Sequence, residues 1–400
     1  MSDLDRREFL RIGTTGLLGL AAAGPAVAAD AAPQVRRRVK LGRTGLVIPD
    51  IGFGSSRLAG DEAVVRHALA RGITYFDTAE SYTDGASETT LGRALRGRRD
   101  EVVLATKTSC EATTTSAALM RALEGSLRRL QTDRVEIYFN HAVNDVARLR
   151  NDEWAAFVER AKRDGKIRFT GVSGHGGRLV ECLDAALDQN SVDVVLVAHN
   201  FGQDPKFFER FTKDTDFIAV QPDLPRVLRK ARAQGVGVVA MKTLRGARLN
   251  DMRPYEAGGA TFAQAALRWV LASGLADALV VTMTANEAVD EYLGASGWTR
   301  TARADGALLT QYEARNGRTQ CRYGCNACAS ACPAGAPIAD LLRARMYAED
   351  YGDAALARAA LAAAGPRALA CLGCSDARCL DACPNGLPIA ELALRAARLA

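Results

Sequence analysis

Eight of the ten cysteines lie in the last fifth of the chain, in two runs of four. The runs are Cys321, Cys325, Cys328 and Cys332, followed by Cys371, Cys374, Cys379 and Cys383. Each run ends in Cys-Pro, and closely spaced cysteines with this ending are typical ligands of a cubane iron–sulfur cluster. Proline has no N–H, and it turns the chain away from the cluster corner that the last cysteine of the run would bind. Eight thiolates suffice for two 4Fe–4S clusters, so the sequence predicts an electron-carrying protein.

Structural zinc and disulfide bonds are the alternatives for these cysteines. Zinc would accept two sets of four thiolates, but it usually binds separated CxxC pairs rather than one run that ends in proline. Cysteines two or three residues apart rarely reach disulfide geometry. The spacing is irregular, because three residues separate Cys321 from Cys325 and four separate Cys374 from Cys379. The spacing therefore leaves open which cysteine occupies which corner.

Four polar side chains nearer the N-terminus form a second candidate site. Asp77, Lys107 and His141 close three consecutive predicted strands, and Tyr82 lies in the loop after the first of these. In a barrel of alternating strands and helices, the carboxyl ends of the strands surround one mouth. A buried lysine–carboxylate pair or a lone histidine is often only structural, but four such groups at neighbouring strand ends favour a catalytic site.

These residue types suit the interconversion of a carbonyl and an alcohol. A carbonyl that accepts hydride becomes an alkoxide and needs a proton, and a phenol with a pKa of about 10 is a poor acid at neutral pH. We therefore expect Lys107 to lower the pKa of Tyr82 and Asp77 to keep that lysine charged. His141 would hydrogen-bond the substrate oxygen as charge develops. The predicted roles are acid/base for Tyr82, tuning for Lys107, orientation for Asp77 and oxyanion stabilisation for His141.

The elements that position these residues alternate between β-branched and amphipathic helical segments. We predict strands at Ile51–Gly54, Ile73–Thr78, Val102–Lys107, Arg134–Asn140, Ile167–Val172, Val192–Ala198, Val236–Met241 and Ala278–Thr282. Helices are predicted at Asp61–Arg71, Ser116–Leu130, Asn151–Arg163 and Leu224–Gln234. Eight strand–helix units in about 260 residues predict an α/β fold, a (β/α)8 TIM barrel. An open doubly wound sheet is disfavoured because no GxGxxG follows the first strand.

Several motifs of this segment resemble the aldo/keto reductase superfamily. They are Gly42-Arg43-Thr44-Gly45-Leu46, FDTAESY, LATKT, the histidine of the fourth strand and Thr170-Gly171-Val172-Ser173. More closely, the chain resembles members with a C-terminal ferredoxin-like domain. The resemblance implies that the family's Asp-Tyr-Lys-His tetrad lies at Asp77, Tyr82, Lys107 and His141, and that NADP(H) is a cofactor.

The resemblance also implies nicotinamide ligands at the mouth. The family usually has asparagine, glutamine and an aromatic residue where this chain has Gly174, Leu196 and Met241, while Ser173 is retained. Arg245 follows the seventh strand, where phosphate groups often bind, although a solvated surface is the alternative. Asn200 or His199, just past the sixth strand, is a candidate substitute ligand, and a polar loop without such a role is the alternative. The predicted cofactor-binding residues are Ser173, Gly174, Asn200 and Arg245.

The segment between the two cysteine runs, Ile338–Ala370, is rich in alanine, leucine and arginine at helical spacing. Two such runs joined by helices resemble the α-helical ferredoxins. In two-cluster ferredoxins the fourth cysteine of each run binds the cluster of the other run. The resemblance therefore implies that Cys332 joins the second cluster and Cys383 the first.

The first thirty residues are typical of a twin-arginine signal peptide. Arg6-Arg7 precede a modest apolar stretch and then Ala26-Val27-Ala28, a small-residue cleavage site. The apolar stretch is shorter than the roughly 20 residues that span a bilayer, so we expect no stable membrane anchor. The twin-arginine export machinery carries folded proteins, which suits a protein whose clusters are inserted before export. We expect a periplasmic or other extracytoplasmic location.

Composition completes the prediction. The chain has 400 residues, 48% hydrophobic and 24% charged, and its net charge of +6 is spread without basic–aromatic blocks, so nucleic acid is not an expected partner. We predict a signal peptide over 1–30, a barrel over 39–298, a linker over 299–319 and a mostly α-helical ferredoxin-like domain over 320–400.

The predicted function is that of an exported oxidoreductase that interconverts a carbonyl and an alcohol and is coupled to two 4Fe–4S clusters. It would act on a small-molecule carbonyl or alcohol and exchange electrons with a redox partner. Two alternatives remain at this point. One is an electron-transfer or partner-binding protein whose barrel no longer uses nicotinamide, and the other is a zinc-stabilised scaffold.

Overall fold

The computed structural model describes residues 32–175, 178–203, 223–244, 252–256, 259–316, 321, 328–350, 354–383 and 386–399. Three sequence predictions lie outside these residues: the twin-arginine segment, Arg245 and Cys325. In the described ranges, no helix is both long and apolar enough to cross a membrane.

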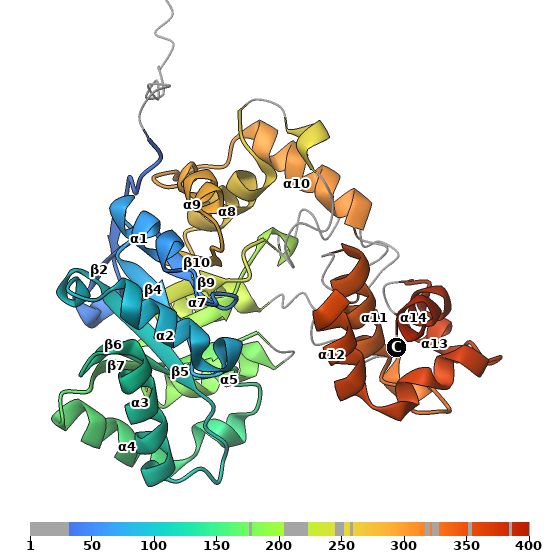
Figure 1. The fold of residues 1–400 in the computed structure, drawn as a ribbon, viewed down its shortest axis with the longest axis horizontal. Helices are drawn as coiled ribbons and strands as arrows, with labels where there is room; N and C mark the ends of the chain where they lie inside the picture. The colour runs from blue at the N-terminus through green and yellow to red at the C-terminus, as the bar shows by residue number, and fades with distance from the viewer. Residues whose placement is uncertain are drawn as a thin grey trace, which may run out of the picture. The chain divides into compact units, whose positions relative to one another are not determined.

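Eight parallel strands close a barrel in chain order, with β10 paired to β3 (Figure 1). The barrel strands are β3 (Ile51–Gly54), β4 (Tyr75–Asp77), β5 (Val103–Thr108), β6 (Val135–Asn140), β7 (Ile167–Gly174), β8 (Val194–Ala198), β9 (Gly237–Met241) and β10 (Ala278–Thr282). All eight predicted strands are present, and their ends differ from the predicted ends by at most two residues. The predicted TIM barrel is confirmed.

A hairpin that the sequence did not predict closes the amino-terminal end of the barrel. Strands β1 (Arg38–Lys40) and β2 (Val47–Pro49) pair antiparallel, and the GRTGL motif forms their turn. Leu41 is fully buried among side chains from the barrel interior. The N–H of Arg43 donates to the carbonyl of Gly235 at 2.6 Å, just before β9. A Cβ on Gly42, whose φ is +49°, would lie 2.4 Å from that carbonyl oxygen, so only glycine fits.

Helices surround the barrel as its outer layer (Figure 1). They are α1 (Glu62–Ala70), α2 (Ala86–Ala94), α3 (Ser116–Leu130), α4 (Asp152–Arg163), α5 (Leu179–Asp188), α7 (Leu224–Ala233), α8 (Phe262–Ala272) and α9 (Asn286–Leu293). Short 3-10 turns occur at η1 (Gly42–Thr44), η2 (Tyr82–Gly85), η3 (Arg99–Glu101), η4 (Val146–Leu149), η5 (Phe201–Gln203) and η6 (Arg253–Tyr255). Four of these helices begin at a residue whose side chain accepts a hydrogen bond from a backbone N–H of the first turn. These N-cap residues are Asp61 for α1, Thr115 for α3, Asn151 for α4 and Thr261 for α8.

The segment 299–319, predicted as a linker, contains helix α10 (Arg303–Asn316). This helix packs on α8, where Tyr312 is fully buried and stacks on Phe262 with ring centroids 4.3 Å apart. Asp305 accepts a hydrogen bond from Arg268 at 3.4 Å. The polar residues of the segment suggest a linker, but its few apolar side chains lie on one buried face. Helix α10 therefore belongs to the barrel rather than to a free connection.

The C-terminal segment forms a separate helical core. It contains η7 (Ala329–Ala331), α11 (Ile338–Arg345), the π-helical η8 (Met346–Asp350), α12 (Ala354–Ala364), η9 (Pro366–Gly373), α13 (Arg378–Asp381) and α14 (Ile389–Ala397). Helix α11 packs against α12 and α14 around the buried side chains of Leu341, Leu361 and Ile389. The predicted helical domain is thus confirmed.

Candidate functional site

The structure brings the four predicted polar residues together at the carboxyl ends of β4, β5 and β6. The fully buried Nζ of Lys107 donates to Oδ1 of Asp77 at 2.5 Å and to the carbonyl of Thr78 at 2.6 Å. The same Nζ lies 3.5 Å from the hydroxyl of Tyr82. The rings of Tyr82 and His141 meet edge to face, with centroids 5.6 Å apart. Four groups from three strand ends therefore form one contiguous polar cluster.

A strained turn places Tyr82 over Lys107. Thr83, Asp84 and Gly85 all have positive φ, at +48°, +52° and +82°. Such a conformation is unfavourable for threonine and aspartate, and it is found where the surroundings hold it. Here the hydroxyl of Thr83 donates to the carbonyl of Leu58 at 2.9 Å. The turn reverses the chain directly after Tyr82 and leaves the phenol at the mouth.

Electrostatics keep Lys107 charged. Burial lowers the pKa of Lys107, but the charges of Asp77 and Tyr82 outweigh this effect and raise it above its usual value. Burial raises the pKa of the Asp77 carboxyl, and the ammonium of Lys107 opposes that rise. An ion pair in a buried site is maintained when the partners also have hydrogen bonds, as Lys107 does through Thr78. Lys107 is thus a fixed cation under the phenol.

The predicted lowering of the pKa of Tyr82 is wrong. Burial raises the pKa of Tyr82 above its usual value, Lys107 lowers it by a smaller amount, and Asp77 raises it further. The carboxylate that holds the lysine therefore also weakens its effect on the phenol. The pKa of His141 shifts in the opposite direction from that of Tyr82, because burial and then the charge of Lys107 lower it to about 3. At neutral pH the site contains a protonated phenol and a neutral imidazole.

Arg148, which the sequence did not single out, holds the loop that carries His141. Its Nη2 donates to the carbonyl of His141 at 2.9 Å and to Oδ1 of Asn140 at 3.2 Å. Nη1 donates to the carbonyl of Ala142 at 3.0 Å, and Nε donates to the carbonyl of Cys110 at 2.8 Å. The guanidinium fork thus ties the loop after β6 to the loop after β5. Arg148 is far in sequence from any strand end, so the sequence pattern does not indicate this role.

Three of the four predicted cofactor-binding residues lie at strand ends in the described ranges. The Ser173 hydroxyl accepts the N–H of Ala142 at 3.0 Å and can still donate its own hydrogen. Gly174 is closely packed, because a Cβ would lie 2.6 Å from Cδ1 of Leu179, which would have to shift. Asn200 donates to the carbonyl of Lys242 at 3.2 Å and accepts from Gly202. Ser173 and Asn200 therefore already support neighbouring loops.

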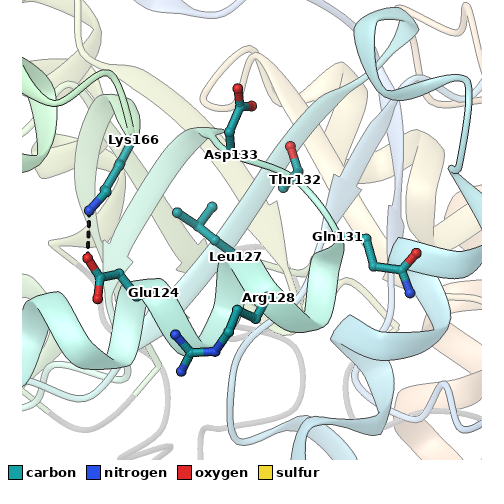
Figure 2. Close-up of a pocket in the computed structure, with 7 residues that line it drawn as sticks. All are labelled: Glu124, Leu127, Arg128, Gln131, Thr132, Asp133 and Lys166. Atoms are coloured by element: carbon teal, nitrogen blue, oxygen red, sulfur yellow. Dashed lines mark hydrogen bonds and ion pairs between the residues drawn. The ribbon is translucent and has the colours of Figure 1, made fainter.

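A hollow of about 590 Å³ lies away from the tetrad, around the C-terminal end of α3 and before β6 and β7 (Figure 2). Its lining residues are Glu124, Leu127, Arg128, Gln131, Thr132, Asp133 and Lys166. Lys166 is paired with Glu124 at 2.6 Å and is committed to a surface ion pair. These residues precede the amino-terminal ends of β6 and β7, opposite the mouth where barrel chemistry is expected.

Most of the cysteines that the structure describes in the helical domain lie at its core, while Cys374 is exposed. Cys328 is buried, and Cys321, Cys332, Cys371, Cys379 and Cys383 pack against the same apolar cluster. After burial, the charges of Cys332, Cys374 and Cys379 raise the pKa of Cys371, so these thiols are close neighbours. The N–H of Ala336 also donates to Sγ of Cys332 at 3.3 Å. Mutual repulsion of this kind fits thiolates that share a cationic cluster, and a backbone N–H donated to sulfur is typical of cluster ligands.

All nine described cysteines are free of disulfide bonds. Within the same described ranges, no three His, Cys, Asp or Glu side chains are arranged to hold a single metal ion.

Comparison with protein families matches both parts of the chain. Residues 50–257 match the aldo/keto reductase family, and residues 319–387 match a 4Fe-4S dicluster domain. The second match supports cluster ligation by the cysteine runs over zinc.

Curated relatives match the barrel. The chain is 30% identical over 233 residues to L-galactose dehydrogenase of Arabidopsis thaliana, a match that covers 54% of this chain and 68% of that protein. It is 35% identical over 149 residues to aldo-keto reductase YhdN of Bacillus subtilis, covering 32% of this chain and 44% of the relative. The chain thus spans less than half the length of YhdN.

Solved structures share the barrel. An aldo/keto reductase from Klebsiella pneumoniae, solved in complex with NADP and acetate, has a TM-score of 0.54 and 26% identity. That match covers 69% of this chain and 95% of the other. A second structure of an aldo-keto reductase from Klebsiella pneumoniae, solved in complex with NADPH, has a TM-score of 0.51 and 25% identity. That match covers 70% of this chain and 95% of the other.

Proposed function

The chain belongs to the aldo/keto reductase family and carries a 4Fe-4S dicluster domain, and from this premise we propose that it is an exported oxidoreductase that interconverts a carbonyl and an alcohol. The observation that carries this proposal is the buried Asp77–Lys107 pair beneath Tyr82, with His141 beside the phenol. This arrangement suits proton transfer to an oxygen on which negative charge develops.

The roles of the four side chains follow from their protonation states. His141, a neutral imidazole, donates a hydrogen bond to the carbonyl oxygen of the substrate and polarises it. Tyr82 then gives its proton to the same oxygen as the alkoxide forms. The resulting phenolate is stabilised by Lys107, whose position is held by Asp77 and the carbonyl of Thr78. In the reverse direction, the phenolate accepts the proton of the alcohol.

The cofactor of this reaction is proposed to be NADP(H), which when bound supplies or accepts the hydride. The O–H of Ser173 is a donor for its carboxamide. A structure from Klebsiella pneumoniae with the same fold is described as a complex with NADP. Asn200 uses one of its two amide N–H groups to bond the carbonyl of Lys242, so it is able to contribute without releasing that bond.

The helical domain is proposed to hold two 4Fe–4S clusters. Cys332, Cys371, Cys374 and Cys379 would bind one cluster, and Cys321, Cys325, Cys328 and Cys383 the other. Hydride carries two electrons while a cluster accepts one at a time. When bound, the clusters would supply one-electron transfer to a redox partner.

Export by the twin-arginine route, with a periplasmic or extracytoplasmic location, is part of the proposal. Its support is the Arg6-Arg7 signal pattern and the need to insert clusters before export. Replacing both arginines by lysine should retain the full-length protein in the cytoplasm. Immunoblots of cell fractions measure where the protein is. Export of the variant at the wild-type level would count against this location.

The proposal as a whole is tested by analysis of protein purified without oxygen. We expect iron and acid-labile sulfide for two clusters, absorption at about 400 nm, nucleotide released on acid precipitation, and reduction of aldehydes. Stoichiometric zinc without iron would favour the scaffold. Clusters without nucleotide or turnover would favour an electron-transfer protein.

The pH dependence of catalysis should follow the protonation states of the site. Carbonyl reduction requires protonated Tyr82, whose pKa is raised, so kcat/KM should be constant between about pH 5 and pH 9 and fall only at higher pH. Alcohol oxidation requires the phenolate and should rise with pH throughout this range. The low pKa of His141, about 3, removes any step near pH 6.5. A reduction rate that halves near neutral pH would contradict this assignment.

Arg148 should act as a positioning residue for His141. Replacing Arg148 by methionine is expected to lower kcat by about 10²-fold, because a displacement of about 1 Å at a reacting group has this effect. Arg148→Lys keeps the charge but not the fork, so it should rescue little of the loss. Arg150→Met, an exposed neighbour, is the matched control and should retain wild-type kcat. Recovery of kcat in Arg148→Lys would indicate a role for charge alone.

A further inference from the structure

Thr108 lies where the chain segments that carry the tetrad meet. It ends β5, directly after Lys107, and its carbonyl accepts the N–H of His141 at 2.8 Å. Its hydroxyl donates to Oε1 of Glu80, which stands two residues before Tyr82. Thr108 is therefore bonded to the loops that follow both neighbouring strands, β4 and β6, and each of these loops carries a group of the proposed reaction.

The side chain of Thr108 faces away from the barrel interior. Successive side chains of a strand alternate between its two faces. On β5, Ala105 packs in the interior cluster, whereas Leu104 packs in a cluster that includes residues of the surrounding helices. Thr108 shares the outer face with Leu104 and is only 3% exposed. A substrate at the mouth would not touch its hydroxyl, so Thr108 can act only through the residues that it holds.

Two bonds hold Glu80 against the end of β5. Its N–H donates to the carbonyl of Lys107 at 3.2 Å, and its carboxylate accepts the hydroxyl of Thr108. A hydrogen bond to a carboxylate is stronger than one between two neutral groups. Tyr82 follows two residues later, so the bond to Thr108 limits how far the loop of Tyr82 can move from Lys107.

A second threonine–glutamate pair on β5 allows a matched comparison. Thr106 lies on the same outer face, and its hydroxyl donates to Oε1 of Glu88 at 2.5 Å. Glu88 lies on α2 and also accepts Nε of Arg129, on α3, at 2.7 Å. This pair joins β5 to the outer helices rather than to a loop that carries a tetrad residue.

We propose that Thr108 is a positioning residue of the site and that it acts through Glu80. It holds Tyr82 over Lys107 on one side and His141 on the other. This inference rests on the proposed function and adds a residue to that site. The hydroxyl of Tyr82 lies 3.5 Å from Nζ of Lys107, which is close to the limit of a hydrogen bond. A small displacement of the loop would therefore end this contact.

The test compares variants that lose one hydroxyl. Thr108→Val should lower kcat for aldehyde reduction by about tenfold with little change in KM, because the loop of the proton donor is held less firmly. Thr106→Val removes the corresponding hydroxyl of the other pair and should keep wild-type kcat. Thr108→Ser keeps the hydroxyl and should restore kcat. Wild-type kcat in Thr108→Val, or an equal loss in Thr106→Val, would overturn the inference.

Replacing Glu80 tests the same contact if Thr108→Val does not fold, because Glu80 is a half-exposed loop residue. Glu80→Leu should reproduce the loss of kcat, and Glu80→Gln, which keeps an acceptor oxygen, should restore most of it. The losses in Glu80→Leu and Thr108→Val should not add in the double variant, since each change removes the same contact. Additive losses would overturn the inference.

Hydrogen exchange measured by mass spectrometry tests the inference without turnover. The backbone of residues 79–85 should exchange faster in Thr108→Val than in the wild type or in Thr106→Val, because fewer bonds oppose local opening of the loop. Equal exchange in Thr108→Val and the wild type would overturn the role of Thr108. A wild-type chain that reduces no aldehyde would contradict the proposed function, and the exchange rates would still decide whether Thr108 holds the loop.

Discussion

Replacing Tyr82 by phenylalanine should lower kcat/KM for carbonyl reduction by about 10²- to 10⁴-fold, the usual contribution of a positioned general acid. Phenylalanine keeps the ring that meets His141 but removes the hydroxyl 3.5 Å from Lys107. When the phenol hydroxyl is removed, Lys107 still has Asp77 and Thr78 as partners. The buried Asp77–Lys107 ion pair should therefore remain. The loss should therefore be catalytic rather than structural.

The measurement combines kinetics with iron and sulfide analysis. Iron and sulfide should be unchanged in Tyr82→Phe, because Tyr82 lies in the barrel and the cysteine runs form part of a separate helical core. Tyr347→Phe, in η8 of the helical domain, is the matched control and should keep wild-type kcat/KM. Retention of more than about a tenth of the activity would show that another group gives the proton. Loss of iron would show that the two domains do not fold separately.

Replacing Cys332 by serine should remove the cluster of the second run rather than that of the first. Cys332 is close enough to Cys371 and Cys379 to raise the pKa of both thiols, after the effect of burial. The variant should lose about half of the iron and acid-labile sulfide, because each cluster needs four ligands. Cys182→Ala, a buried thiol on α5, is the control and should keep full iron.

Double variants decide between the two assignments of Cys332. If Cys332 binds the second cluster, Cys332→Ser with Cys374→Ser should lose one cluster, and Cys332→Ser with Cys328→Ser should lose both. The reverse result would place Cys332 with its own run. Circular dichroism of each variant shows whether α11, α12 and α14 remain helical while iron is lost.

The sequence predicted the elements better than their packing. Strands β3 and β10 and helix α3 lie at the predicted residues because β-branched runs and helical spacing are local patterns. The β1–β2 hairpin and α10 were not predicted. Each depends on a few apolar side chains that stand among polar residues in the sequence. Leu41 is buried only because the barrel offers it an interior, and Tyr312 because Phe262 lies opposite.

The sequence also predicted some residues of the candidate site and missed others. Residue type and strand position identified Asp77, Tyr82, Lys107 and His141. The role of Arg148 emerged only when distant loops were placed side by side. The pKa of Tyr82 was predicted in the wrong direction because the sequence indicates which charges are present but not how much water is excluded.

The amino-acid sequence alone identified the barrel, the two cysteine runs and the four polar residues at the barrel mouth, because periodicity and spacing are properties of the chain itself. Tertiary structure decided which loops hold His141, which thiols neighbour Cys332 and which protonation state Tyr82 adopts. These depend on burial and on distances between segments far apart in the sequence, and both arise only when the chain is packed.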